Sequence, residues 1–183
     1  FFPAVFSSLI IGYLWNFIMS SSDFGLINNI LHQLGLGTLN FFTSKNALYS
    51  VILTQIWQWT GWAMVIFLAN LQSISPDLYE AAEIDGANGL KKFMYVTLPL
   101  MCPSVKIVIV TGLIGGMKVF DIIYVLTNGG PGFDTQVLAT YTYQSFSLGF
   151  LGESSAGSVI LAVIVVIISF TMNRYFTKRE VEM

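Results

Sequence analysis

Residues 156–175 read AGSVILAVIVVIISFTMNRY, and this stretch decides the class of the fold. Between Val159 and Phe170 it holds no charged residue. A run of roughly 20 mostly apolar residues is long enough to cross a bilayer as a helix. β-branched residues favour strands in water, but a segment in lipid must satisfy its own backbone hydrogen bonds, and a helix does this. The stretch therefore predicts a transmembrane helix.

Three other parts of the chain have a similar apolar character, at about residues 2–19, 47–71 and 100–126. Of the 183 residues, 55% are hydrophobic and only 10% are charged, against about 25% charged in a typical soluble domain. We therefore expect an all-α, polytopic membrane helix bundle with about four spans. The chain opens on Phe1 within an apolar run, so we expect a fragment that has lost its N-terminal part.

Basic residues between the spans predict the orientation. Lys91 and Lys92 lie in one connection, and Arg174, Lys178 and Arg179 follow the last span. The other two connections hold only one Lys or Arg residue between them, Lys45. Because basic residues favour the cytoplasmic side, we expect the segment at about 72–98 and the C-terminus to be cytoplasmic.

The outer connection after the third span begins with a dense turn signal, Asn128-Gly129-Gly130-Pro131-Gly132. We expect Asp134 or Thr135 to cap a short helix that runs through about Phe146. This segment is too polar to span, so it is expected to lie at the membrane interface.

The connection at 72–98 predicts two short helices separated by a glycine. Ser75 is a favoured N-cap residue, Pro76 suits the first helical position, and Asp77 brings negative charge to the first turn. Gly86 stands where a left-handed C-terminal stop is wanted. Two small alanines, Ala81 and Ala82, allow another surface to approach the backbone closely. A simple surface helix remains the alternative.

The same residues resemble a known motif. Glu80-Ala81-Ala82, three residues, Gly86, nine residues and Val96-Thr97-Leu98-Pro99 are similar to the cytoplasmic motif of bacterial ABC-importer permeases, with Val in place of the usual Ile. Asp85-Gly86-Ala87 resembles the version found in carbohydrate permeases. The stretch 120–131, FDIIYVLTNGGP, is similar to the subunit type that includes the larger maltose permease and the glycerol-phosphate permeases. The resemblance extends over nearly the whole chain.

The resemblance implies a partial permease domain over 1–183 that holds about four of a usual six spans in the bacterial cytoplasmic membrane. Its implied partners are an ATP-binding subunit, a second permease subunit, an extracytoplasmic solute-binding protein and membrane lipid. It further implies that the loop at about 72–98 couples the permease to the ATPase. The implied coupling residues are Glu80, Ala81, Ala82, Asp85, Gly86, Leu98 and Pro99.

Polar residues inside the spans are candidates for the solute path, because charge at mid-membrane is costly unless it faces a cavity or a partner. Lys118, Asp121 and Tyr124 are three apart and would share a helix face. Lys118 and Asp121 forming a structural pair is the alternative. Gln55, Gln58 and Trp59 are a second set, for which helix–helix hydrogen bonding and an aromatic interface belt are the alternative.

Nothing in the sequence predicts a catalytic site, a metal site or a cofactor. It has no glycine-rich phosphate loop, so ATP is expected on another chain. His32 is the only histidine and Cys102 the only cysteine, and a net charge of −2 argues against nucleic acid. The predicted function is import of a sugar or sugar derivative, driven by a separate ATPase. The alternatives are a permease for another polar solute, such as a polyol phosphate, and an ATP-independent channel or transporter.

Overall fold

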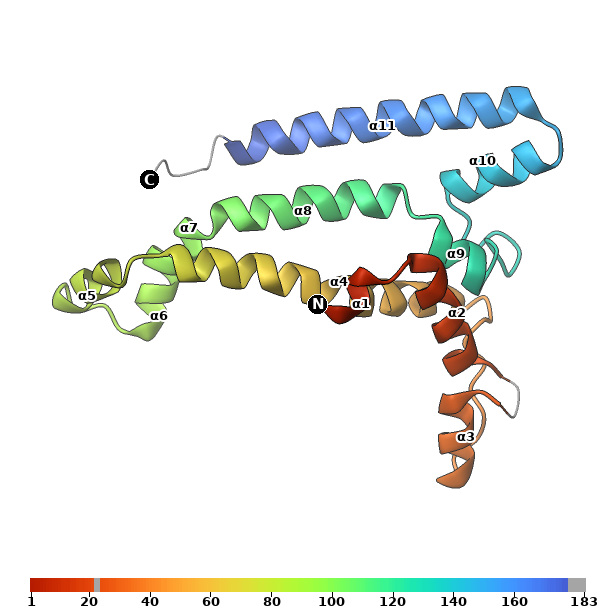
Figure 1. Cartoon of the computed structure of the whole chain (residues 1–183), viewed down its shortest axis with the longest axis horizontal. Helices are drawn as coiled ribbons and strands as arrows, with labels where there is room; N and C mark the ends of the chain where they lie inside the picture. Colours follow the sequence, from red (N-terminus) through yellow and green to blue (C-terminus); the bar gives the residue numbers. More distant parts are fainter. Residues whose placement is uncertain (22–23, 178–183) are drawn as a thin grey trace. The chain divides into compact units, whose positions relative to one another are not determined.

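The computed structural model describes residues 1–21 and 24–177, and no strand occurs among them (Figure 1). It divides into two compact units, the first formed by residues 1–61 with 118–163 and the second by residues 62–117 with those from 164 onward. The expected all-α fold is therefore confirmed. Lys178 and Arg179, used to predict the orientation, lie outside the described residues.

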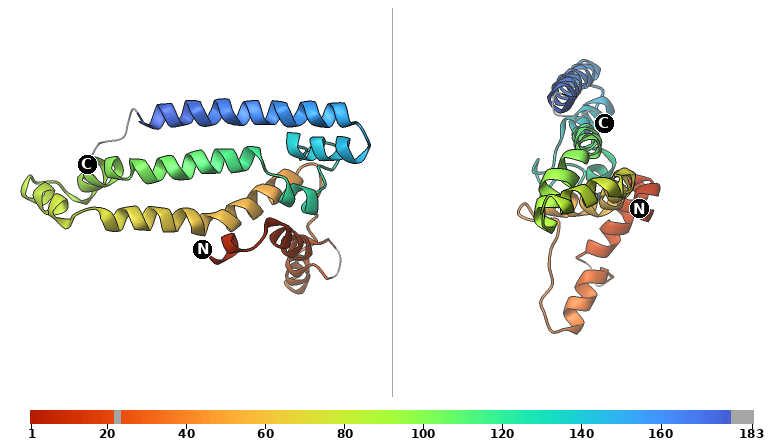
Figure 2. Two further views of the ribbon diagram at one scale, coloured as in Figure 1. Left: turned by 45° about the horizontal axis from the view of Figure 1, so that its top comes forward. Right: turned by 90° about the vertical axis from the view of Figure 1, so that its left-hand side faces the viewer.

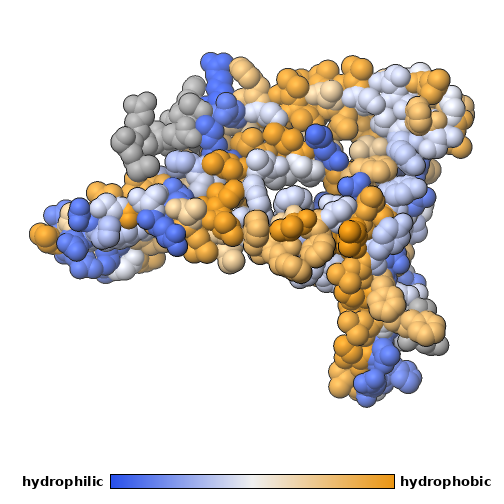
Figure 3. Space-filling view, in the orientation of Figure 1, coloured by the Kyte–Doolittle hydropathy of each residue, from blue (hydrophilic) through white to orange (hydrophobic). Residues whose placement is uncertain are grey.

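Two long apolar helices match predicted spans. α4 runs over Ala47–Ser73 and α11 over Leu151–Thr177, and each is long and apolar enough to cross a bilayer. Apolar residues dominate the face of α11 drawn in Figure 3. Most of its side chains are exposed in the isolated chain, as expected for a helix whose surroundings are lipid or other subunits rather than water.

The first predicted span is interrupted. A short α1, Phe2–Val5, is followed by α2, Ser8–Met19. Phe6 is extended, and Ser7 caps the new helix by accepting a hydrogen bond from Leu9 N at 3.3 Å. At 1.5 Å per residue, α2 is about 18 Å long, which is shorter than the roughly 30 Å hydrocarbon core.

The third predicted span is interrupted twice. A bend of 60° separates the segment Gly89–Leu100 from α8, Cys102–Met117. The chain then leaves the helix at residues 118–120 before α9, Asp121–Leu126. Counting the bent pair as one span gives three long spans among the described residues, not the predicted four.

Packing explains why α9 is separate from α8. Ile122, Ile123 and Leu126 of α9 join Ile11 and Val51 in the buried core of the first unit. α9 packs mainly on α2, and Gly12 of α2 lets Val125 approach so closely that an added Cβ would lie 3.0 Å from Val125 Cβ. The Gly115–Gly116 pair near the end of α8 weakens the helix locally. The burial of the apolar side chains of α9 on α2 then determines that the chain breaks before Asp121.

The turn predicted at residues 128–132 contains three left-handed residues, with φ of +50° at Asn128, +88° at Gly129 and +58° at Gly132. The predicted cap on the following helix, α10 at Leu138–Ser147, was wrong. Thr135 instead donates to Gly130 O at 2.8 Å inside the turn, and Thr140 accepts from Val137 N at 3.0 Å. The helix therefore starts later than its sequence suggests.

A buried amide organises the connection around α3, Leu26–Gln33. Asn28 is 3% exposed, its Nδ2 donates to Ser20 O and Leu39 O at 2.9 Å each, and its Oδ1 accepts from Leu39 N at 2.8 Å. These bonds close the segment between α2 and α4 on itself.

We expect Asn28→Ala to loosen this segment, because it leaves buried backbone groups without partners at a cost of about 1–3 kcal/mol each. Limited proteolysis of the full-length protein should cleave residues 20–40 at least about tenfold faster. Asn29→Ala is the matched control, since Asn29 is exposed and its Oδ1 accepts a hydrogen bond from Gln33 Nε2 of the same helix at 2.9 Å. Equal cleavage of the two variants contradicts the prediction.

Candidate coupling loop and solute path

α5, Pro76–Ile84, begins as its sequence predicts. Ser75 Oγ accepts from Asp77 N at 3.3 Å, Pro76 occupies the first helical position, and Asp77 provides the acid of the first turn. The positive end of the helix dipole is thereby neutralised. The three features together explain why nine residues in a short connection hold a helix.

The helix stops at the predicted glycine. Gly86 has φ +76°, and Ala87 N donates to Ala82 O at 2.9 Å, the closing bond typical of a left-handed C-terminal stop. The next helix, α6 at Gly89–Lys92, is capped by Asn88 Oδ1, which accepts from Lys91 N at 3.0 Å. Figure 2 shows α5 and α6 side by side at the end of α4, and residue contacts join the two helices.

An ion pair between Glu83 and Lys92 also joins α5 to α6. The hydrogen bond and the charge of the Lys92 ammonium lower the pKa of Glu83 below its ordinary value. Because the pKa of Glu83 is lowered on folding, the pair stabilises the loop at pH values above the ordinary carboxyl pKa. This stabilisation is lost as acidification protonates Glu83. Near neutral pH the pair is intact.

α5 has an outward and an inward side. Asp77, Glu80, Ala81 and Ile84 are exposed, whereas Tyr79 and Ala82, three residues apart, are half-buried. Of the predicted coupling residues, Glu80 and Ala81 therefore lie outward and Ala82 lies inward. Asp85 and Gly86 are exposed at the end of the helix.

Leu98 and Pro99 lie elsewhere, in the three-residue α7, Leu98–Leu100. They are separated from the outward side of α5 by the π-helical turn η1, Phe93–Thr97. Pro99 has no N–H to donate to the carbonyl of Tyr95, and its ring crowds that carbonyl, so a widened turn before it is expected. Leu98 N bonds Phe93 O accordingly.

The sequence interpretation missed Ile84, whose side chain is 88% exposed. Figure 3 shows that the loop around it is largely hydrophilic. Burying an isoleucine that is otherwise in water gains about 1.5–3 kcal/mol. The sequence pattern that could have identified Ile84 is its position four residues after Glu80, which puts both on the same side of the helix.

The first unit holds all six solute-path candidates, but the structure groups them differently from the prediction. Lys118 lies before α9 and Asp121 begins it, so the two are not on one helix. No ion pair joins these two described residues. The helix face predicted for Lys118, Asp121 and Tyr124 was therefore wrong, because the chain breaks at 118–120.

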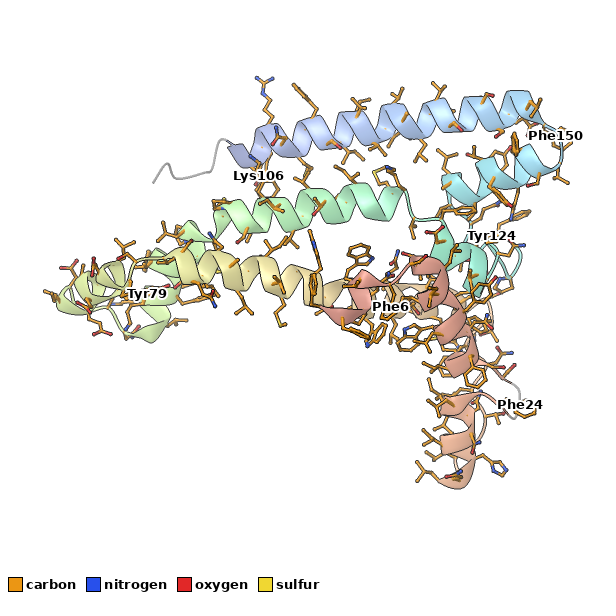
Figure 4. The ribbon with its side chains drawn as sticks, in the orientation of Figure 1. Phe6, Phe24, Tyr79, Lys106, Tyr124 and Phe150 are labelled. Atoms are coloured by element: carbon orange, nitrogen blue, oxygen red, sulfur yellow. The ribbon has the colours of Figure 1, made fainter. Side chains whose placement is uncertain are left out.

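Tyr124 belongs to an aromatic cluster that the sequence did not predict. Its ring stacks on Phe120 with centroids 5.2 Å apart and meets Tyr143 of α10 edge-on at 5.3 Å. Phe120 and Tyr143 are themselves 5.1 Å apart. Figure 4 shows Tyr124 at the side of α9 that faces α10. Only the fold brings Tyr143 here, because it lies 19 residues further along the chain.

The three candidates on α4 differ in exposure. Gln58 is 1% exposed, and its Nε2 donates to Phe6 O at 3.4 Å and to Ser8 Oγ at 3.2 Å, across the break between α1 and α2. Gln55 is half-buried and its Oε1 has no hydrogen-bond partner within the described structure. Trp59 is 44% exposed. The Gln58 Nε2 thus helps to hold this break, whereas its buried Oε1 has no hydrogen-bond partner within the described structure.

Comparison with known proteins places the chain in a family. The family model described as binding-protein-dependent transport system inner membrane component matches residues 1–180. The chain is 34% identical over 172 residues to the arabinooligosaccharides transport system permease protein AraP of Bacillus subtilis, which covers 92% of this chain and 55% of that protein. It is 38% identical over 156 residues to the trehalose/maltose transport system permease protein MalF of Thermococcus litoralis, with coverages of 85% and 52%.

A crystal structure supports the same placement. The fold is similar to a chain of a bacterial alginate ABC transporter solved in complex with an alginate pentasaccharide-bound periplasmic protein, with a TM-score of 0.81 and 29% identity over 94% of this chain and 60% of that one. The chain spans about half the length of the curated relatives it matches. It therefore belongs to the inner membrane components of binding-protein-dependent transport systems, the permeases of ABC importers.

Proposed function

We propose that this chain is part of a permease subunit that moves a sugar or sugar derivative across the cytoplasmic membrane, driven by ATP hydrolysis in a separate subunit. The observation that carries the proposal is α5, a capped helix with an exposed side of Glu80, Ala81 and Ile84 that ends at a left-handed glycine. Its residues Glu80, Ala81, Ala82 and Gly86 resemble the cytoplasmic motif of permeases in the family to which the chain belongs.

In this proposal α5 docks on the ATPase subunit, and the segment at about 72–98 and the C-terminus are cytoplasmic. Lys91 and Lys92 in the loop and Arg174 in the last turn of α11 support this orientation. A second permease subunit and an extracytoplasmic binding protein complete the transporter. The alginate importer that shares the fold is itself bound to a periplasmic protein. The chain itself is proposed to perform no covalent chemistry.

A sugar is the proposed solute class because the similar proteins are named for arabinooligosaccharides, for trehalose or maltose and for alginate. The cluster of Phe120, Tyr124 and Tyr143 supports this, since aromatic rings pack on the apolar faces of sugar rings. Asp121 beside the cluster offers an acceptor for hydroxyl groups. We retain Lys118, Gln55, Gln58 and Trp59 as candidates on the same path.

Uptake by proteoliposomes tests the proposal. They would hold the full-length permease with its co-purifying subunits, with the binding protein outside and ATP either enclosed or omitted. We expect uptake of maltose, trehalose or an arabinooligosaccharide that requires enclosed ATP. Uptake without ATP would instead favour a channel or secondary transporter. Uptake of glycerol 3-phosphate alone would favour the polyol-phosphate alternative.

A further inference from the structure

The inward side of α5 carries a contact that the family motif does not include. The hydroxyl groups of Tyr79 and Thr97 are 3.1 Å apart. Thr97 is only 8% exposed, although most of the loop is exposed. Figure 4 shows Tyr79 within the loop, between α5 and the segment that returns toward α8. A hydrogen bond between partly buried groups fixes an orientation that apolar contact alone leaves free.

The backbone of Thr97 is hydrogen-bonded to the residue at which the chain bends. Its carbonyl accepts from Met101 N at 3.0 Å, and Met101 is the residue between the two segments that meet at 60°. The Tyr79 hydroxyl therefore contacts the residue whose carbonyl accepts a hydrogen bond from Met101, the residue at the bend before α8. A displacement of α5 can therefore act on the bend at Met101 through this side-chain contact, in addition to the covalent backbone that connects them.

The hydrogen bonds continue beyond the bend. The Ser104 hydroxyl, 3% exposed, lies 2.8 Å from Met101 O and 3.1 Å from Asn70 Oδ1, and shares its one proton between these acceptors. Asn70 belongs to the last turns of α4. A continuous set of polar contacts thus runs from α5 through the bend at Met101 to α8 and α4, the two helices that flank the loop.

We propose that Tyr79 is a positioning residue, whose hydrogen bond to Thr97 transmits movement of α5 to the bend at Met101. The hydrogen bonds of Ser104 to Met101 and Asn70 then transmit this movement to α4. This deepens the proposed function and rests on it, because the movement is the one that nucleotide binding imposes on α5 through the ATPase. The outward side of α5 determines docking, whereas the inward side determines how the docked helix moves the spans. A transmission route requires evidence of coupling between its members.

Hydrogen exchange on the intact transporter, in nanodiscs with and without the ATP analogue AMP-PNP, tests the proposal. In the wild type we expect the nucleotide to change exchange at residues 76–84 and at 98–105. Tyr79→Phe removes the hydroxyl and keeps the ring. The net contribution of a hydrogen bond corresponds to a factor of about 2–10, so we expect an about threefold smaller change at 98–105. The amount of bound ATPase and the nucleotide-dependent change in exchange at residues 76–84 should be the same as in the wild type.

Three variants separate positioning from general loss of structure. Tyr95→Phe is the matched control, because Tyr95 is 79% exposed in the same loop, and it should behave as the wild type. Thr97→Val should reproduce Tyr79→Phe, and Thr97→Ser, which keeps the hydroxyl, should not. The double variant Tyr79→Phe with Thr97→Val should be no worse than either single one, because both remove the same bond.

The outcomes distinguish the two proposals. If no ATPase co-purifies with the wild type, the proposed function fails. If the ATPase binds but AMP-PNP leaves residues 98–105 unchanged, or changes them equally in wild type and Tyr79→Phe, the positioning role is overturned. An equal loss in Tyr95→Phe overturns it as well.

Discussion

Glu80→Lys should lower the amount of ATPase subunit that co-purifies with the full-length permease at least about tenfold. Glu80 is exposed on the outward side of α5, within four residues of the exposed Ile84. A charge reversal at the centre of a docking surface costs about 2 kcal/mol or more, and each 1.4 kcal/mol is a factor of ten in affinity. The measurement is the ratio of ATPase to permease after purification from membranes, at equal permease levels.

Two matched comparisons define this test. Asp134→Lys makes the same charge change at an exposed residue between α9 and α10 and should retain the ATPase. Gly86→Val should lose it, because a β-branched residue at φ +76° is strained. Gly89→Val has open space around its Cβ and no positive φ, and should retain it. Equal retention by Glu80→Lys and Asp134→Lys would show that α5 does not dock on the ATPase.

Gly12→Val should destabilise the core of the first unit. A Cβ at Gly12 would lie 3.0 Å from Val125 Cβ and 3.1 Å from Val125 Cγ1, and the two further methyl groups of valine add to this overlap. Overpacking of a core costs about 1–3 kcal/mol. We expect a lower thermal unfolding temperature of the full-length permease in detergent, with less monodisperse protein on size exclusion.

The space around other glycines gives the control. Gly112→Val, in α8, meets nothing within 4 Å of its Cβ and should leave the unfolding temperature near that of the wild type. Val125→Ala combined with Gly12→Val should recover part of the lost stability, because it removes the methyl groups that clash. A Gly12→Val variant as stable as the wild type would mean that α2 and α9 do not pack as described.

The predictions that were confirmed depend on neighbours in sequence. Ser75, Pro76 and Gly86 define α5 through contacts within a few residues, so their pattern was sufficient to place the helix. α11 follows from an uninterrupted apolar run, which needs no partner to be recognised as a helix.

The predictions that failed depend on residues distant in the chain. The break before Asp121 exists because α9 buries its apolar side chains on α2, more than 100 residues earlier. Gln58 stays a candidate for the solute path, and its partners at the break near Ser8 likewise lie far from it in the chain. No local pattern records such contacts.

By itself the sequence determined that this protein is an all-α membrane protein with a capped, glycine-terminated helix in its loop, because apolar runs, caps and turns act over a few residues. Only the tertiary structure decided which side of α5 is exposed, that Tyr79 reaches Thr97 four residues before the bend, and that Tyr143 joins Phe120 and Tyr124. These contacts join side chains separated by 18 residues or more, and their formation depends on how whole helices pack.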